Sequence, residues 1–138
     1  MKAINTIKSL LLVDKPIYFS SKQRKIFLSI TLFWVIVITL KDYVYRPYVY
    51  ENNIWDMHIA DSSSSFFSVI VGVFFAYSIE RKQLFTHLGI VLLSELAFLF
   101  YEVVMSYRFD YYDIWATLLG GYPAYLLSGF VLNKMKSL

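Results

Sequence analysis

The chain contains no cysteine among its 138 residues, and charged residues make up only 17% of it. Without cysteine, a disulfide framework, a thiolate metal site and a cysteine nucleophile are all excluded. Soluble domains are typically about 25% charged and about 45–50% apolar, whereas this chain is 58% hydrophobic and 20% aromatic. Polar residues are too scarce to cover a water-soluble globule, so the composition predicts a membrane protein.

Motifs that would identify a particular chemistry are also missing. The sequence has no HExxH, GxSxG, P-loop or glycine-rich dinucleotide motif. Two distant histidines without cysteine make a poor set of zinc ligands, so we expect no metal or other cofactor. A net charge of +3 that is scattered along the chain excludes the concentrated basic face of a nucleic-acid interface.

Four segments have the length and apolarity to cross a bilayer, whose core needs around 20 mostly apolar residues. The first segment is short, but the span can be extended to include Tyr43 and Val44. The sequence therefore predicts an all-α, polytopic integral membrane protein with four transmembrane helices. The predicted spans are residues 26–40, about 62–79, about 84–105 and about 111–132.

Basic residues predict the orientation of these spans. Ten of the 13 Lys and Arg residues lie before the first span, between the second and third, or after the fourth; the other three are Lys41, Arg46 and Arg108. Cytoplasmic segments of membrane proteins carry an excess of Lys and Arg. We therefore expect both termini in the cytoplasm and residues 42–60 and 106–111 outside.

The chain divides into residues 1–24, a basic segment, and residues 25–138, the transmembrane domain. Two interpretations of the basic segment remain open: an amphipathic helix on the cytoplasmic surface, or a tail that only sets the orientation. Outside, tyrosines alternate around a proline in residues 43–50, which is typical of extended chain. These tyrosines form either an aromatic belt at headgroup depth or a surface that binds a lipid-linked sugar or a peptide.

Acidic residues within the third span are unfavourable for membrane insertion, because a carboxylate at mid-bilayer costs at least about 2.5–3.5 kcal/mol. Helical spacing puts His87, Glu95 and Glu102 close to one face. Either this face belongs to a proton path, a substrate path or a polar cavity, or Glu95 stays protonated and bonds to a neighbouring helix, for example at Thr117 or Ser68.

A second polar group lies around the predicted outer ends of the third and fourth spans. Its members are Glu102, Arg108, Asp110 and Asp113. The connecting loop is only about five residues long, so we expect Arg108 to bond carboxylates at both helix ends or to grip a phosphate. Helix capping is the alternative, although it explains Asp113 only in part because that residue lies inside the first turn.

Small residues recur every four positions in the fourth span, and such a stripe allows helices to approach closely. We expect it to serve packing within the bundle or an oligomer, with a kink at Pro123. The stripe consists of Ala116, Gly120, Ala124 and Ser128.

The region from Glu102 to Gly121 resembles the VanZ-like family of bacterial membrane proteins. That family has an R-x-F-D-x-x-D loop followed by a helix that begins D-[IV]-x-A-[NT]-x-x-G. This chain matches it at Arg108, Phe109, Asp110, Asp113, Ala116, Thr117 and Gly120. Met105 stands where the family has glutamine, and the histidine that usually follows the residue matched by Asp61 is absent.

The resemblance implies a multi-pass protein of the bacterial cytoplasmic membrane, some relatives of which are linked to glycopeptide (teicoplanin) resistance. It implies no reaction, so whether the chain is an enzyme stays open. Three functions remain: an envelope protein that alters how cell-wall or membrane-directed agents act, an enzyme or carrier for a lipid phosphate at the outer leaflet, and a structural subunit of a larger complex. Membrane lipids are the expected partners in each.

Overall fold

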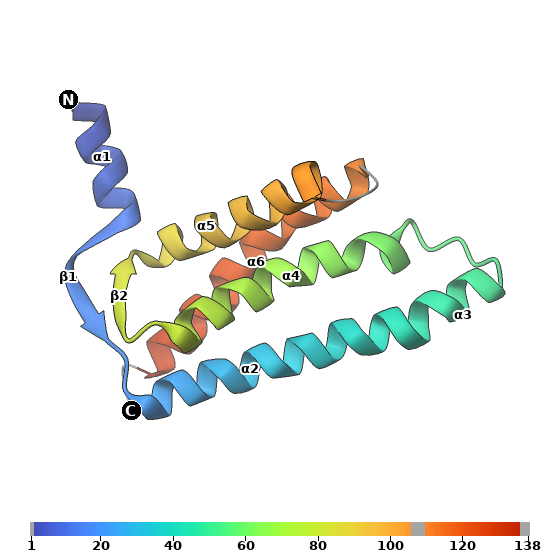
Figure 1. Cartoon of the computed structure of the whole chain (residues 1–138), viewed down its shortest axis with the longest axis horizontal. Coiled ribbons are helices and arrows are strands. Elements are labelled where there is room, and N and C mark those ends of the chain that lie inside the picture. The colour runs from blue at the N-terminus through green and yellow to red at the C-terminus, as the bar shows by residue number, and fades with distance from the viewer. Residues whose placement is uncertain (1, 106–109, 136–138) are drawn as a thin grey trace.

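The computed structural model describes residues 2–105 and 110–135. Four of its helices are long and apolar enough to cross a membrane, which confirms the predicted number. Figure 1 shows them side by side in a bundle, with a small sheet and a short helix at one end. In chain order the elements are α1 (Lys2–Leu11), β1 (Leu12–Tyr18), α2 (Ser21–Leu40), η1 (Lys41–Tyr45), α3 (Arg46–Glu51), α4 (Ile59–Ile79), β2 (Lys82–Phe85), α5 (His87–Phe100), η2 (Tyr101–Met105) and α6 (Tyr111–Met135).

The first long helix is much longer than the predicted span, because α2, the π-helical turn η1 and α3 run on without a break from Ser21 to Glu51. It begins with a capping box, in which Ser20 Oγ accepts from the Gln23 amide and Gln23 Oε1 accepts from the Ser20 amide. At 1.5 Å per residue its 31 residues extend roughly 45 Å. The helix therefore exceeds the thickness of a bilayer core, and α3 forms its far end.

The prediction of extended chain over residues 43–50 is wrong. Pro47 lies in the first turn of α3, directly after the turn where the hydrogen-bond pattern of the continuous helix changes, and a proline has no N–H to donate to that turn. The turn before it is π-helical, since the Arg46 amide donates to the Lys41 carbonyl. The alternating tyrosines consequently point around a helix and do not line one side of a strand.

Helix α4 lies at the centre of the bundle, and its buried face carries much of the core. That face consists of Val69, Ile70, Val73, Phe74 and Tyr77. Phe27 of α2 stacks on Tyr77 with ring centroids 4.9 Å apart. Phe19, from the segment before α2, contacts both rings edge to face. Aromatic contacts thus join α2 to α4 near the end that carries the sheet.

Helix α6 packs against α4 at the stripe of small residues. Gly120, Ala124 and Ser128 are buried there, and Ala116 is half-buried. A Cβ at Gly120 would collide with the carbonyl oxygen of Phe66 in α4, so only glycine permits this approach. The stripe is used for packing within the chain.

The outward faces of the long helices are apolar. Leu32, Phe33 and Ile36 of α2 are each more than half exposed, as are Trp115 and Leu119 of α6. Large exposed apolar surfaces of this kind are unfavourable in water and suit contact with lipid. The distribution of apolar residues agrees with a bundle whose outside faces acyl chains.

A two-stranded sheet, which the sequence did not predict, covers one end of the bundle. Strand β1 pairs antiparallel with β2 and brings residues 12–18 over the start of α5. The N-terminal segment is therefore a helix and a strand attached to the bundle, and it is more than a tail. We call this end the sheet end and the opposite one, where the first long helix finishes, the α3 end (Figure 1).

We predict that Gly120→Ala lowers the free energy of unfolding by about 1–3 kcal/mol, the usual cost of overpacking a tight contact. Thermal unfolding in detergent measures the change. Gly129→Ala is the matched control, because its Cβ would lie 3.3 Å from the His87 side chain and not against a main chain. Both variants gain the same helix propensity. Equal unfolding temperatures for the two variants would contradict the close α4–α6 contact.

Candidate functional site at the α3 end

Polar residues from three helical segments surround a hollow of about 460 Å³ at the α3 end. The helical spacing of each group puts its members on one face: residues 42, 46 and 50 on the first long helix, 61, 64 and 65 on α4, and 110 and 113 at the start of α6. We call it the α3-end hollow. Its lining residues are Asp42, Arg46, Tyr50, Asp61, Ser64, Ser65, Asp110 and Asp113.

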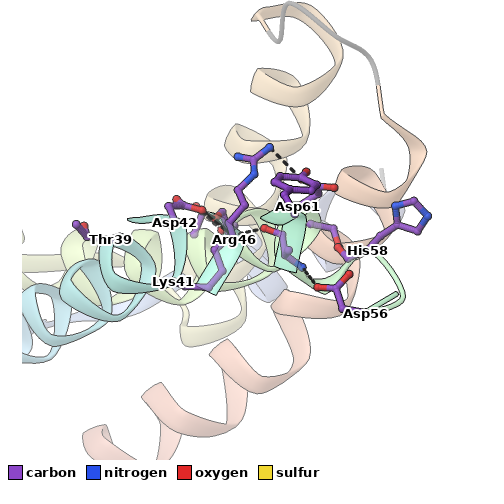
Figure 2. A network of polar contacts seen from close by, with 12 residues as sticks. Thr39, Lys41, Asp42, Arg46, Asp56, His58 and Asp61 are labelled. Atoms are coloured by element: carbon purple, nitrogen blue, oxygen red, sulfur yellow. Dashed lines mark hydrogen bonds and ion pairs between the residues drawn. The ribbon is translucent and has the colours of Figure 1, made fainter. Parts of the chain in front are cut away.

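Lys41 connects the first long helix to the beginning of α4. Its ammonium group donates to the Ala60 carbonyl at 2.8 Å and to Ser64 Oγ at 2.7 Å, and it pairs with Asp42 at 2.6 Å. Ser64 in turn donates to both carboxylate oxygens of Asp42, at 3.1 and 3.2 Å. These contacts close a three-residue network at the wall of the hollow, and Figure 2 shows Lys41 and Asp42 within it.

Arg46 makes the second connection between the same two helices. Its guanidinium NH2 lies 2.9 Å from Asp61 Oδ1, an ion pair that Figure 2 marks with a dashed line. The Tyr50 hydroxyl donates to the same carboxylate oxygen, and the guanidinium lies over the Tyr50 ring at 5.8 Å from its centroid. Asp61 is therefore held by two partners from one face of α3.

The loop between α3 and α4 is fastened on both sides. Asp56 accepts from the Ala60 amide at 2.6 Å and from the Tyr45 hydroxyl at 3.3 Å. His58, which has a left-handed backbone conformation, stacks on Tyr112 of α6 with centroids 4.1 Å apart. The loop thus holds the beginnings of α4 and α6 together beside the hollow.

Two predicted site residues face each other across the α4–α6 side of the hollow. Ser65 Oγ donates to Glu102 Oε1 at 2.9 Å, and Glu102 lies in the π-helical turn η2 that ends the third span. Asp113 lies within electrostatic reach of Glu102 and Asp110. Among the described residues, its buried Oδ1 has no hydrogen-bond partner. A buried acceptor without a donor is costly, so a donor from a ligand would be favourable here.

The structure places the other predicted residues differently. Arg108 lies outside the described residues, so its expected bonds to Glu102 and Asp113 stay a prediction. Glu95 has no hydrogen-bond partner among the described residues. The hydroxyls of Thr117 and Ser68, its expected partners, donate to carbonyls of their own helices. The Glu95 carboxylate instead lies against Gly121, where a Cβ would approach Oε2 to 2.7 Å.

The face of α5 that carries His87 and Glu95 points toward α6. Glu95 contacts Gly121, and His87 Nε2 lies 2.9 Å from the Tyr125 carbonyl. His87 Nδ1 lies 2.9 Å from the hydroxyl of Tyr77, which is fully buried. Because a carbonyl can only accept, Nε2 carries a proton and Nδ1 is free to accept from the tyrosine. His87 therefore ties α5 to both α4 and α6.

The sequence analysis missed Lys41, Asp42, Arg46, Ser64 and Ser65 as site residues. The sequence does contain a signal for Asp42 and Arg46: together with Tyr50 they recur every four residues, which places them on one face of a helix. The alternation of tyrosines over the same stretch concealed it, since that pattern indicated extended chain. In the described part of the chain, no group of three His, Asp or Glu residues could hold a metal ion.

We predict that Lys41→Met lowers the free energy of unfolding, since it removes the cation paired with the Asp42 carboxylate and the side-chain donor to the Ala60 carbonyl. The Lys41 side chain is only 11% exposed and that of Asp42 is 35% exposed. The cost should be about 1–3 kcal/mol, between that of an exposed ion pair and a deeply buried one. Lys25→Met, at an exposed position of the same helix, is the control in the same thermal unfolding assay. A loss no larger than that of the control would show that the network does not join the helices.

Comparison of the chain with models of protein families, with curated proteins and with solved structures finds no match. The residues that carry the VanZ-like resemblance nevertheless have definite places where the structure describes them. Asp110 and Asp113 line the α3-end hollow, while Thr117 and Gly120 are buried. The motif therefore combines one wall of the hollow with the helix contact that positions it.

Proposed function

We propose that this chain is a multi-pass protein of the bacterial cytoplasmic membrane that binds the headgroup of a lipid-linked molecule in the α3-end hollow. The observation that carries the proposal is the hollow itself, about 460 Å³ in volume and lined by polar residues at one end of an otherwise apolar bundle. Pockets for small ligands are about 300–1,000 Å³. With the termini in the cytoplasm, this end faces the outer leaflet.

The charges of the hollow favour a headgroup that carries an amine. Among the described residues, four carboxylates line it, against one guanidinium that is already paired with Asp61. An ammonium group could donate to the unpartnered Oδ1 of Asp113, and a phosphate on the same headgroup could accept from the remaining guanidinium N–H groups of Arg46. A bare lipid phosphate fits the described lining less well, because the surrounding carboxylates repel it.

The VanZ-like resemblance supports an envelope role for such binding. By occupying headgroups at the outer leaflet, the protein would alter how cell-wall or membrane-directed agents meet the membrane. Nothing in this role requires a bond to be broken, so we propose a binding protein and not an enzyme. The second candidate, an enzyme or carrier for a lipid phosphate, needs the charge of Arg108 to outweigh the carboxylates.

We predict that the purified full chain binds phosphatidylethanolamine at least about tenfold more tightly than phosphatidylglycerol or phosphatidic acid with the same acyl chains. Asp113→Asn should remove most of this preference, because a charge-assisted hydrogen bond contributes about 1.5–3 kcal/mol, or about tenfold or more in affinity. Native mass spectrometry of the detergent-solubilised protein, titrated with each lipid, counts the bound molecules.

The matched control is Glu51→Gln, which removes the same charge from an exposed residue at the end of α3. It should leave the preference unchanged. Tightest binding of phosphatidic acid, unaffected by Asp113→Asn, would contradict the amine-bearing ligand and favour the lipid-phosphate candidate. In a bacterium that expresses the chain, Asp113→Asn at normal abundance should also abolish any change in teicoplanin susceptibility that the parent confers.

A further inference from the structure

A second cavity lies at the sheet end, far along the bundle from the α3-end hollow. Its volume is about 530 Å³, and β1, β2, α5 and α6 all contribute to its wall. We call it the sheet-end pocket. The residues used in the argument below are Tyr18, Gln23, Gln83, Leu126, Phe130 and Asn133.

An irregularity in the sheet leaves room for this pocket. Leu12 pairs with Phe85 and Ile17 pairs with Gln83, so that β1 has several more residues than β2 between the two paired positions. The excess residues of β1 must bow away from β2. Val13, one of them, lines the pocket. The strand is therefore a cover over the end of the bundle and is not packed flat against it.

The cover is fastened on both sides of the bowed stretch. The Thr86 amide and hydroxyl donate to the carbonyls of Leu11 and Leu10, at 2.8 and 2.5 Å. A Cβ at Gly89 would come within 2.5 Å of the Leu11 carbonyl oxygen, so glycine allows the cover to lie directly on α5. Beyond the strand, the Phe19 amide donates to the Arg81 carbonyl at 3.1 Å.

The lining of the pocket is apolar apart from uncharged polar groups. None of the described residues that line it is Asp, Glu, Lys or Arg, and His87, which also lines it, is hydrogen-bonded to the Tyr77 hydroxyl and the Tyr125 carbonyl. The amides of Gln23, Gln83 and Asn133 line it. Gln23 already accepts from the Ser20 amide and donates to the Met135 carbonyl, and Gln83 donates to the Phe85 carbonyl, so a ligand would use the remaining donor and acceptor positions of these groups. Inside the pocket such a lining selects an uncharged polar group on an apolar body, because a charged group there would lose its hydration without a counter-charge. A cation lies at the rim, where the Lys134 ammonium group is 5.0 Å from the centroid of the Phe130 ring.

The rim of the pocket faces the surroundings of the bundle. Leu126 and Phe130 of α6 are 50% and 60% exposed, although both line the cavity and belong to a helix long and apolar enough to cross a membrane. Exposed basic residues lie at the same end of the bundle, among them Lys22, Lys82 and Lys134. Lysines of this kind typically reach the headgroup region. The pocket thus opens toward lipid near the depth of the headgroups.

We infer that the sheet-end pocket binds a membrane lipid with an uncharged head, in which a hydroxyl or ester oxygen bonds the amide groups and the chain lies along Leu126 and Phe130. The inference requires insertion of the four helices in a bilayer but not the headgroup binding proposed for the α3 end. It gives the attached N-terminal strand a role, which is to close one side of a lipid site.

The probe is a monoacylglycerol with a photoreactive diazirine in its chain, added to the full chain in phosphatidylcholine vesicles. Irradiation followed by digestion and mass spectrometry locates the label. We expect labels concentrated within residues 17–19 and 126–130 and displaced by excess unlabelled monoacylglycerol. The same chain on a phosphate head should label these residues at least about fivefold less, as an unpaired charge is excluded. Equal labelling by the two probes would overturn the uncharged head.

Two variants test the pocket directly. Leu126→Trp fills it and should reduce labelling at residues 17–19 at least about fivefold, whereas Leu127→Trp, at a 40% exposed position outside the lining, should not. Asn133→Leu, at an exposed rim position, should lower labelling about threefold through one lost hydrogen bond. Labels spread evenly over exposed α6 residues such as Leu118 and Leu119, and unchanged in both pocket variants, would overturn the inference.

Discussion

The close approach of α6 to α4 at Gly120 positions the polar features at both ends of the bundle. Helix α6 begins beside the α3-end hollow, with Asp113 in its first turn, and finishes beside the sheet-end pocket. Because the helix is a rigid element pressed against the Phe66 carbonyl, a shift at Gly120 would move both ends together. A side chain at this one position would therefore open the hollow and displace the wall of the pocket, although neither site contains Gly120.

The buried hydroxyls of Thr31 and Ser128 are satisfied within their own helices, whereas polar side chains at the ends of the bundle reach across to a neighbour. Thr31 and Ser128, both buried, donate to the carbonyls four residues earlier, at 3.0 and 2.5 Å. Lys41, Arg46 and Ser65 instead contact α4 or η2, and His87 contacts Tyr77 and Tyr125. Apolar packing thus holds the middle of the bundle, while hydrogen bonds and ion pairs fix the positions of the ends where ligands are proposed.

Composition and hydrophobic runs were sufficient to predict four long apolar helices, since the length of a span follows from the thickness of a bilayer. The small-residue stripe likewise predicted a close contact for α6, because a helix presents residues four apart on one face. The sheet could not be predicted, as the pairing of β1 with β2 joins segments that are far apart in the sequence and show no alternating pattern. The side of the hollow formed by the first long helix was missed for a different reason. Residues 42–50 carry two periods at once, tyrosines every two and the polar Asp42, Arg46 and Tyr50 every four, and only the period of four describes their structure.

The helical continuation through residue 50 is the central claim, because it alone brings Arg46 against Asp61 and completes the hollow. Since the chain has no native cysteine, paired cysteine variants treated in intact membranes with a short bifunctional thiol reagent test it directly. Arg46→Cys with Asp61→Cys should cross-link, whereas Tyr48→Cys with Asp61→Cys should not, because residue 48 lies on another face of the helix. In an extended segment residues 46 and 48 would share a side and cross-link alike. Equal cross-linking of the two pairs would contradict the account, and cross-linking confined to the first pair is the result it predicts.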